Sequence, residues 1–236
     1  MPTILSVTAM SLLRSVHRSS STLKESASMV ETQNLFAWTK RHAWQGVLAD
    51  GHYGKAGKSG VTVRLRTGPG IATFIASTEG HVAVGTAIRE RLGLVLPLTP
   101  EALCAGHLQA VWNGPGQWLI IADNRERFQE TLADLAKFGA VSDQSDSRAV
   151  LSLSGARVYD VLAKGVMIDL HPANFPIGAA ASTSIAQVGA SLWRRADDLA
   201  GPVFEVMVAR SFFGSFWSWF SASAAEFGCT VQDEIQ

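Results

Sequence analysis

The stretch HLQAVWNGPGQWLIIA, residues 107 to 122, indicates the fold more clearly than any other part of the sequence. Two apolar runs, His107 to Trp112 and Gln117 to Ala122, are joined by Asn113-Gly-Pro-Gly116. Asparagine and glycine tolerate the positive φ angles that tight turns require, so this junction predicts a β-hairpin.

Helices are predicted on both sides of this hairpin. The segment from Val82 to Leu92 has helical character, and from Arg125 to Phe138 the apolar residues recur at spacings of three and four, so they share one helix face. Strand-like residues 61–76 precede the first helix, and a short strand at residues 140–142 follows the second. The predicted order is β-α-β-β-α-β.

The second half of the chain repeats this order. A strand from Ala149 to Leu153 leads into a helix that ends near Lys164, and two longer strands are expected at Ser184 to Arg194 and Val203 to Ala209. A last helix begins with Ser211 as a plausible N-cap, and a strand at Cys229 to Val231 closes the unit. The residues expected on the inner face of this last helix are Phe212, Phe216, Trp219 and Phe220.

Together these patterns predict an α+β protein built of two consecutive ferredoxin-like β-α-β-β-α-β halves, residues 59–144 and 145–236, each with helices on one face of an antiparallel sheet. Residues 1–58 are expected to form an extended or disordered N-terminal arm. The glycine- and lysine-rich stretch of residues 50–60 is interpreted as a flexible loop, because its glycine spacing and the strand that follows do not fit a phosphate-binding loop.

The composition limits the classes of partner. Formal net charge is zero, which argues against nucleic acid and anionic membrane surfaces, and no stretch has the length of a membrane span. Charged residues make up 17% of the chain and hydrophobic residues 47%, which is typical of a buried subunit interface or of a monomer with a large core. Cys104 and Cys229 are far apart and are expected to be reduced thiols in a cytoplasmic protein. The basic, serine-rich stretch of residues 1–24 resembles either a transit peptide or a disordered tail.

The sequence offers no candidate catalytic, cofactor-binding or metal-binding residue. Its six histidines lack metal-ligand spacing, and no Gly-x-Ser-x-Gly or dinucleotide-binding pattern is present. Neither cysteine has a base beside it in the sequence. Acidic residues that cluster at 143 and 146, at 169, and at 197 and 198 are better explained by turn and capping chemistry than by acid-base catalysis.

The aromatic residues predict an interface. Trp217 and Trp219 cannot both face inward on one helix, because residues two apart point about 200° apart. Large aromatics in a polar arm also tend to dock on a surface. The predicted partner interface consists of Phe36, Trp38, Trp44, Trp217 and Trp219.

Several segments, taken in order, resemble the gamma subunit of heterotetrameric sarcosine oxidase. The resemblance extends from about residue 61 to the end of the chain. The segments that carry it are Gly114-Pro-Gly-Gln-Trp-Leu-Ile120, Asp143-Gln-Ser-Asp-Ser-Arg148, Leu151-Ser-Leu-Ser-Gly-Ala-Arg157, Val161-Leu-Ala-Lys-Gly165, Asp169-Leu170, Phe175-Pro-Ile-Gly178 and Phe204-Glu-Val-Met-Val-Ala-Arg-Ser211.

This resemblance implies a non-catalytic structural subunit in a complex with alpha, beta and delta chains. Such a complex oxidatively demethylates sarcosine or a related N-methyl amine, acting on a CH-NH bond, and passes the one-carbon unit to tetrahydrofolate or releases formaldehyde. The resemblance places FAD, FMN, NAD and tetrahydrofolate on the other chains. It also implies a fold similar to the folate-binding region of the glycine-cleavage T-protein.

The same resemblance argues against folate binding by this chain. In the T-protein relatives an acidic residue before the Gly-Tyr-Glu of the corresponding strand grips the pterin. Here Phe204-Glu205 is kept, but Ala200-Gly-Pro202 stands where the earlier acid is expected. Three alternatives stay open: a gamma-type subunit of N-methylglutamate dehydrogenase, a stand-alone folate-binding one-carbon protein, and an interaction protein outside this metabolism.

Overall fold

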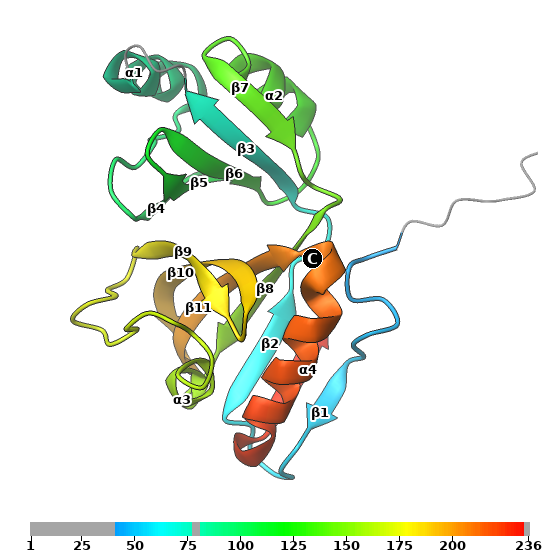
Figure 1. Cartoon of the computed structure of the whole chain (residues 1–236). Helices are drawn as coiled ribbons and strands as arrows, with labels where there is room; N and C mark the ends of the chain where they lie inside the picture. The colour runs from blue at the N-terminus through cyan, green and yellow to red at the C-terminus, as the bar shows by residue number, and fades with distance from the viewer. Residues whose placement is uncertain (1–40, 77–80, 234–236) are drawn as a thin grey trace, which may run out of the picture. The chain divides into compact units, whose positions relative to one another are not determined.

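Alternating apolar residues form two β-sheets in the computed structural model, which describes residues 41–76 and 81–233 (Figure 1). Within these residues one sheet has five strands in the order β4-β5-β6-β3-β7. The other has seven, in the order β1-β12-β2-β8-β11-β10-β9. The coarse prediction of an α+β protein with two sheets is confirmed.

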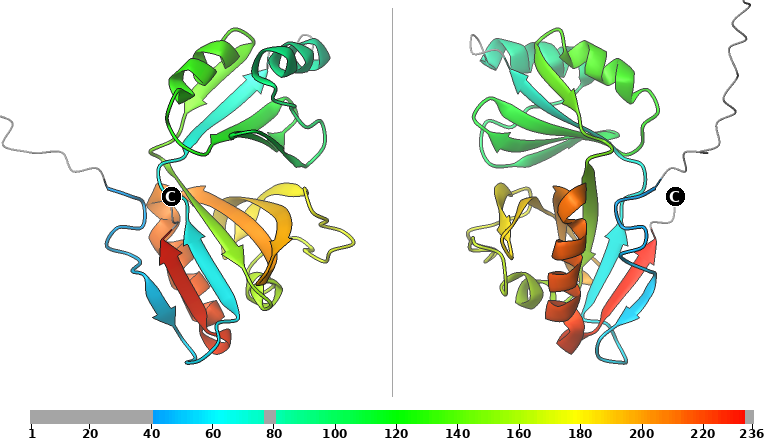
Figure 2. Two further views of the ribbon diagram at one scale, coloured as in Figure 1. Left: turned by 180° about the vertical axis from the view of Figure 1, so that it is seen from behind. Right: turned by 45° about the vertical axis from the view of Figure 1, so that its right-hand side comes forward.

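The five-stranded sheet contains the hairpin that the sequence indicates most clearly. β5 and β6 pair with Trp112 opposite Trp118, and a bulge follows before Gly114, whose φ of 150° suits glycine. Two helices, α1 and α2, lie on one face of this sheet (Figure 2). Gly70 is required there, because a Cβ at this position would lie 2.5 Å from the Phe128 ring. The elements are β3 (Gly70–Ala76), α1 (His81–Leu92), β4 (Ala102–Ala105), β5 (Leu108–Gly114), β6 (Gln117–Ala122), α2 (Phe128–Leu135) and β7 (Gly139–Asp143).

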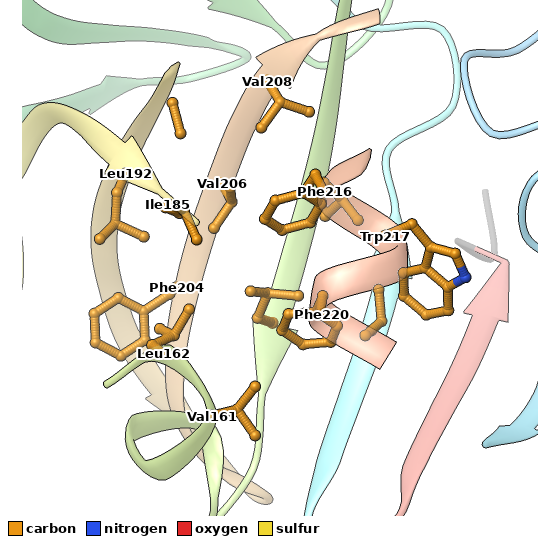
Figure 3. Close-up of a cluster of buried hydrophobic side chains, with 14 of the residues drawn as sticks. Val161, Leu162, Ile185, Leu192, Phe204, Val206, Val208, Phe216, Trp217 and Phe220 are labelled. Atoms are coloured by element: carbon orange, nitrogen blue, oxygen red, sulfur yellow. The ribbon is translucent and has the colours of Figure 1, made fainter. Parts of the chain in front are cut away.

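The seven-stranded sheet gathers strands from both ends of the described chain. Helices α3 and α4 pack on its apolar face, where α4 places Phe216 and Phe220 against strand residues such as Val206 (Figure 3). Its elements are β1 (Gly51–Tyr53), β2 (Val61–Leu65), β8 (Arg148–Ser154), α3 (Val158–Leu162), β9 (Ala180–Ile185), β10 (Val188–Asp198), β11 (Gly201–Ala209), the 3-10 turn η1 (Arg210–Phe212), α4 (Phe213–Ala224), the 3-10 turn η2 (Ala225–Phe227) and β12 (Cys229–Asp233).

Strand β2 corrects the prediction of two consecutive halves. The predicted strand over residues 61–76 is two strands, separated by Arg66-Thr-Gly-Pro69, and they lie in different sheets. Val63 of β2 pairs in parallel with Val231 of β12 and antiparallel with Leu153 of β8. Residues 59–144 therefore contribute β2 to a sheet whose other strands are β1 and five strands of residues 145–236. Apart from β1 and β2, each half has the order β-α-β-β-β-α-β, with one more strand between its helices than predicted.

The stretch of residues 50–60, predicted to be a flexible loop of the arm, instead has specific contacts. Gly51 to Tyr53 form β1, which pairs antiparallel with β12 and so satisfies the backbone of that strand's outer edge. The Ser59 hydroxyl lies 2.5 Å from the Thr230 hydroxyl, and His52 Nε2 lies 2.6 Å from the carbonyl of Lys55. Part of the predicted arm is therefore an edge of the sheet.

Two element predictions in the second half were wrong in detail. The predicted single strand from Ser184 to Arg194 is a hairpin of β9 and β10, turning at Ala186 and Gln187, whose φ angles are 47° and 71°. Ser211 lies in η1 and does not cap α4, because α4 begins at Phe213 without a side-chain cap. This shift leaves Phe212 55% exposed and buries Phe213 instead.

A small apolar layer joins the two sheets. Tryptophan, methionine and aliphatic side chains from both sheets form a buried cluster separate from the two helix-covered cores. Its buried members are Ile71, Val111, Leu119, Ile121, Val150, Ala180, Trp193 and Met207. The faces turned away from the helices are thus used for contact between the sheets.

Leu65→Ala is expected to destabilise the chain by about 2–5 kcal/mol, because Leu65 is fully buried in β2 and its loss leaves a cavity. Leu199→Ala makes the same chemical change at a fully exposed turn and should alter stability by less than about 0.5 kcal/mol. Urea unfolding of both variants measures the difference. An equal loss of unfolding free energy in both variants would contradict the position of β2 in the interior of the sheet.

Candidate functional site

The clearest group of buried charged residues lies at the end of the β10-β11 hairpin. Val188, Ala190 and Leu192 of β10 face the helix-covered core, and strand alternation puts Arg194 on the same side. The Arg194 side chain is only 5% exposed. The hairpin therefore carries a cation into apolar surroundings, which requires specific partners.

Arg194 finds those partners within the chain. Its guanidinium carbon lies 5.4 Å from the Phe204 ring centre and 5.5 Å from the Tyr159 ring centre. It donates hydrogen bonds to the Tyr159 hydroxyl and to the Asp197 carboxylate. Burial raises the pKa of the Tyr159 hydroxyl, against the opposing charge of Arg194. A phenol with a raised pKa serves as a neutral hydrogen-bond partner here and not as a base.

The loop that contains Phe175-Pro-Ile-Gly178 is fixed against the same strand. The amide of Gly178 donates to the Arg194 carbonyl, and the Arg194 amide donates to the Ala179 carbonyl, both at 2.9 Å. Phe175 stacks on Phe204 with ring centres 6.3 Å apart. This segment therefore encloses the Arg194 cluster.

Glu205 occupies the opposite face of β11. It pairs with Trp193 across the hairpin and is 1% exposed, on the side that meets the five-stranded sheet. Its carboxylate accepts a hydrogen bond of 3.1 Å from Arg195. Glu205, the acid that the sequence analysis describes as kept, is thus buried between the sheets and paired with Arg195.

The turn between β10 and β11 contains Ala200-Gly-Pro202, where the sequence analysis expected a folate-binding acid to be missing. Ala200 and Gly201 donate their amides to the Asp198 carboxylate at 2.7 and 3.1 Å. Partial burial tends to raise the pKa of Asp198, but these hydrogen bonds and the one from Arg64 hold it below its usual range. The carboxylate nearest to Ala200-Gly-Pro202 in sequence is therefore engaged in closing the turn.

Of the other acidic residues noted in the sequence, Asp143 and Asp169 also have turn roles. Asp146 and Asp197 instead pair with arginines. Asp143 accepts hydrogen bonds from the amide and the hydroxyl of Ser145, at 2.9 and 2.6 Å. Asp169 accepts from the His171 amide at 2.8 Å and from the Asn174 side chain at 2.5 Å. The prediction of turn chemistry for Asp143 and Asp169 agrees with their contacts.

The structure separates the residues of the predicted partner interface. Trp217 is 5% exposed and packs edge-on against Tyr53 at 5.3 Å, so it belongs to the chain's own core. Trp219 is half-buried against Gly165, where a Cβ would lie 2.4 Å from the indole. Trp44 is half-buried and stacks on His42 at 4.9 Å. Phe36 and Trp38 lie outside the described residues.

Sequence reasoning missed the Arg194 cluster. A signal was present, because Arg194 follows Val188, Ala190 and Leu192 at the strand period of two and so continues an inward-facing row. Its ring partners on α3 and β11 could not be identified, because their approach depends on the tertiary packing.

The described residues show no metal-binding cluster, no membrane-spanning helix and no reactive buried thiol. Within them, no group of three or more His, Cys, Asp or Glu side chains could hold a metal ion. Among the described helices, none combines the length and apolar character needed to cross a bilayer. Cys229 is buried, which raises the pKa of its thiol to about 12 and makes it a poor nucleophile at neutral pH.

The architecture defines a two-sheet α+β protein whose most buried charges are paired internally. The profile of the "Sarcosine oxidase, gamma subunit family" matches residues 77–226. The chain belongs to the sarcosine oxidase gamma subunit family.

Individual known proteins agree with this assignment. The sarcosine oxidase subunit gamma of Corynebacterium sp. (strain P-1) is 36% identical over 137 residues, which cover 56% of this chain and 62% of that relative. This chain thus spans less than two thirds of the relative's length. A chain of the heterotetrameric sarcosine oxidase from Corynebacterium sp. U-96, solved with pyrrole 2-carboxylate, is 28% identical with a TM-score of 0.62, covering 73% of this chain and 87% of that one.

A weaker similarity concerns the T-protein. The glycine cleavage system aminomethyltransferase T from Bartonella henselae gives a TM-score of 0.48 at 13% identity, covering 75% of this chain and 48% of that chain. This similarity is too low to support a conclusion about folate binding.

Arg194→Ala is expected to destabilise the chain by about 2–4 kcal/mol, because it removes charge-assisted hydrogen bonds and the packing between Tyr159 and Phe204. Arg127→Ala, at an exposed arginine that pairs with Glu130, should cost less than about 1 kcal/mol. Urea unfolding compares the two. If Arg194→Ala were as mild as its control, the cluster would not be structural.

The two cysteines are expected to differ in reactivity. Cys104 is exposed and Cys229 is buried, so one equivalent of thiol should react quickly with a disulfide reagent in the native protein and two after denaturation. Cys104→Ser should remove the fast phase. Two equally fast thiols in the native protein would contradict the burial of Cys229.

Proposed function

We propose that this chain is a non-catalytic structural subunit of a heterotetrameric sarcosine oxidase-type flavoenzyme, with alpha, beta and delta chains as partners. The complex would oxidise the CH-NH bond of sarcosine or a related N-methyl amine in the cytoplasm. The observation that carries the proposal is the similarity to a chain of a heterotetrameric sarcosine oxidase over 87% of that chain's length.

The contacts of the buried charges support a structural role. Arg194 uses Tyr159 and Asp197 as partners, and Glu205 accepts from Arg195, so these groups already have functions in folding. A catalytic group needs access to a substrate. The side chains of Arg194 and Glu205 are only 5% and 1% exposed. FAD, FMN, NAD and tetrahydrofolate are therefore assigned to the other chains, with none bound by this one.

The proposed partner interface keeps the aromatics that the chain does not bury completely. Trp44 and Trp219 are half-buried, and partly exposed tryptophans are frequent anchors of protein interfaces. Phe36 and Trp38 are kept in the proposal on sequence grounds alone. Trp217 is removed from it, because its indole fills the core beside Tyr53.

Purification of the tagged chain from its native cell tests the proposal. We expect large alpha- and beta-type chains in the eluate by mass spectrometry, together with flavin absorbance and amine-dependent dye reduction. Comparing sarcosine with N-methylglutamate as substrate distinguishes the two related assemblies. The isolated chain should be colourless and inactive.

A chain that is recovered alone from cells grown on sarcosine would contradict the subunit assignment. Calorimetry with tetrahydrofolate then separates the remaining alternatives. Tight binding by the isolated chain would favour a stand-alone folate-binding protein, whereas no binding would favour an interaction protein outside this metabolism.

A further inference from the structure

Arginines from five separate segments line one small surface pocket. They come from the segment before β1, the residue after β2, the connection between β6 and α2, the first residue of β8, and η1. The lining arginines are Arg41, Arg66, Arg125, Arg148 and Arg210. Because these segments are far apart in sequence, only the folded chain brings the five cations together.

Acidic residues compensate these arginines only in part. Arg125 pairs with Asp146 at 2.8 Å, and Arg66 pairs with Asp123 at 2.9 Å. Of the two carboxylates, only Asp146 lines the pocket. Among the described residues, Arg148 and Arg210 have no carboxylate partner. The pocket thus has a clear excess of positive charge.

Arg148 and Arg210 instead donate to neutral oxygens. Arg148 Nε donates to the Gln144 side chain at 2.9 Å. Arg210 donates to the carbonyl of Arg41 at 2.7 Å and to that of Asp146 at 3.4 Å. These bonds orient the guanidinium groups, while each still has other N–H groups that can donate to an anion.

The partial burial of Arg148 increases the cost of leaving its charge without a carboxylate partner. Desolvation of the Arg148 guanidinium lowers its pKa, because the charged form loses hydration that no neighbouring carboxylate replaces. An anion would reverse that cost, since guanidinium groups bind carboxylate and phosphate oxygens in a bidentate manner.

Aromatic contacts hold one wall of the pocket, formed by His42 and Trp44, in place. Trp44 stacks on His42 and contacts Phe213 of α4 with ring centres 6.4 Å apart. The pocket volume is about 30 Å³, which suits one small group.

We propose that this pocket binds a single small anionic group, either a carboxylate or a phosphate. Such a group has two possible sources: a free anion from solution, or the carboxylate side chain of a neighbouring subunit. The second source rests on the proposed function, whereas the first does not.

Thermal unfolding of the full chain in sodium phosphate, against sodium chloride of equal ionic strength, tests the site. At ten times the dissociation constant, phosphate should raise the Tm by about 4 °C. Arg148→Gln should lose most of this shift. Arg127→Gln removes the same charge outside the pocket and should keep it.

A phosphate shift that is equal in Arg148→Gln and Arg127→Gln would overturn the proposal, as would no shift in the unaltered chain. If Arg148→Gln fails to fold, Arg210→Gln provides the same comparison, because its side chain lies at the more exposed rim.

The purified complex distinguishes the two sources. A phosphate-dependent shift that persists in the complex identifies a free anion. Loss of that shift on assembly, together with lower recovery of the complex for Arg148→Gln than for Arg127→Gln, identifies a partner's carboxylate. Failure to isolate any complex would contradict the proposed function and leave the phosphate result on the isolated chain unchanged.

Discussion

The hydrogen bonding of β2 is the constraint on which the rest of the structure depends. This strand lies between β12 and β8, so the last strand of the described chain reaches its sheet only through a strand from the beginning. A parallel pair such as β2-β12 cannot be closed by a short turn, and here the connection runs through residues 66–228. After β2, the chain passes directly into β3 of the other sheet. The chain returns through the short connection from β7 to β8, so two short connections join the sheets.

Buried charge occurs on both faces of the seven-stranded sheet. The helix-covered faces are filled with aromatic and aliphatic residues, and the opposite faces meet in the apolar layer around Trp193 and Met207. Arg194 and Glu205 come from opposite faces of adjacent strands, so each sits at the margin of a different layer. Because both have partners within the chain, the buried charges specify how the hairpin packs and do not form a reactive pair.

Local structure could be predicted from the sequence wherever nearby residues determine it. The β5-β6 hairpin follows from Asn113-Gly-Pro-Gly116, and α2 follows from its apolar spacing. The strand character of β2 could also be predicted, but its sheet could not be, because Val63 pairs with the distant residues Val231 and Leu153. The division of β9 from β10 escaped prediction because Ala186 and Gln187 adopt positive φ angles without the glycine or asparagine that usually indicates such a turn.

In the candidate site, too, local contacts could be predicted from the sequence and long-range contacts could not. The roles of the acidic residues in turns were predictable, because Asp143, Asp169 and Asp198 bond to groups within a few residues. The arginine pocket was not, since its members share no motif and converge only in the fold. A net charge of zero excludes long-range attraction of a polyanion, but it does not limit charge within a single pocket. Salt screens exposed charges beyond about 8–10 Å, so a local excess of guanidinium acts only at contact distance. An anion bound there would be recognised by geometry after encounter, which suits a subunit contact or a small solute and not electrostatic steering.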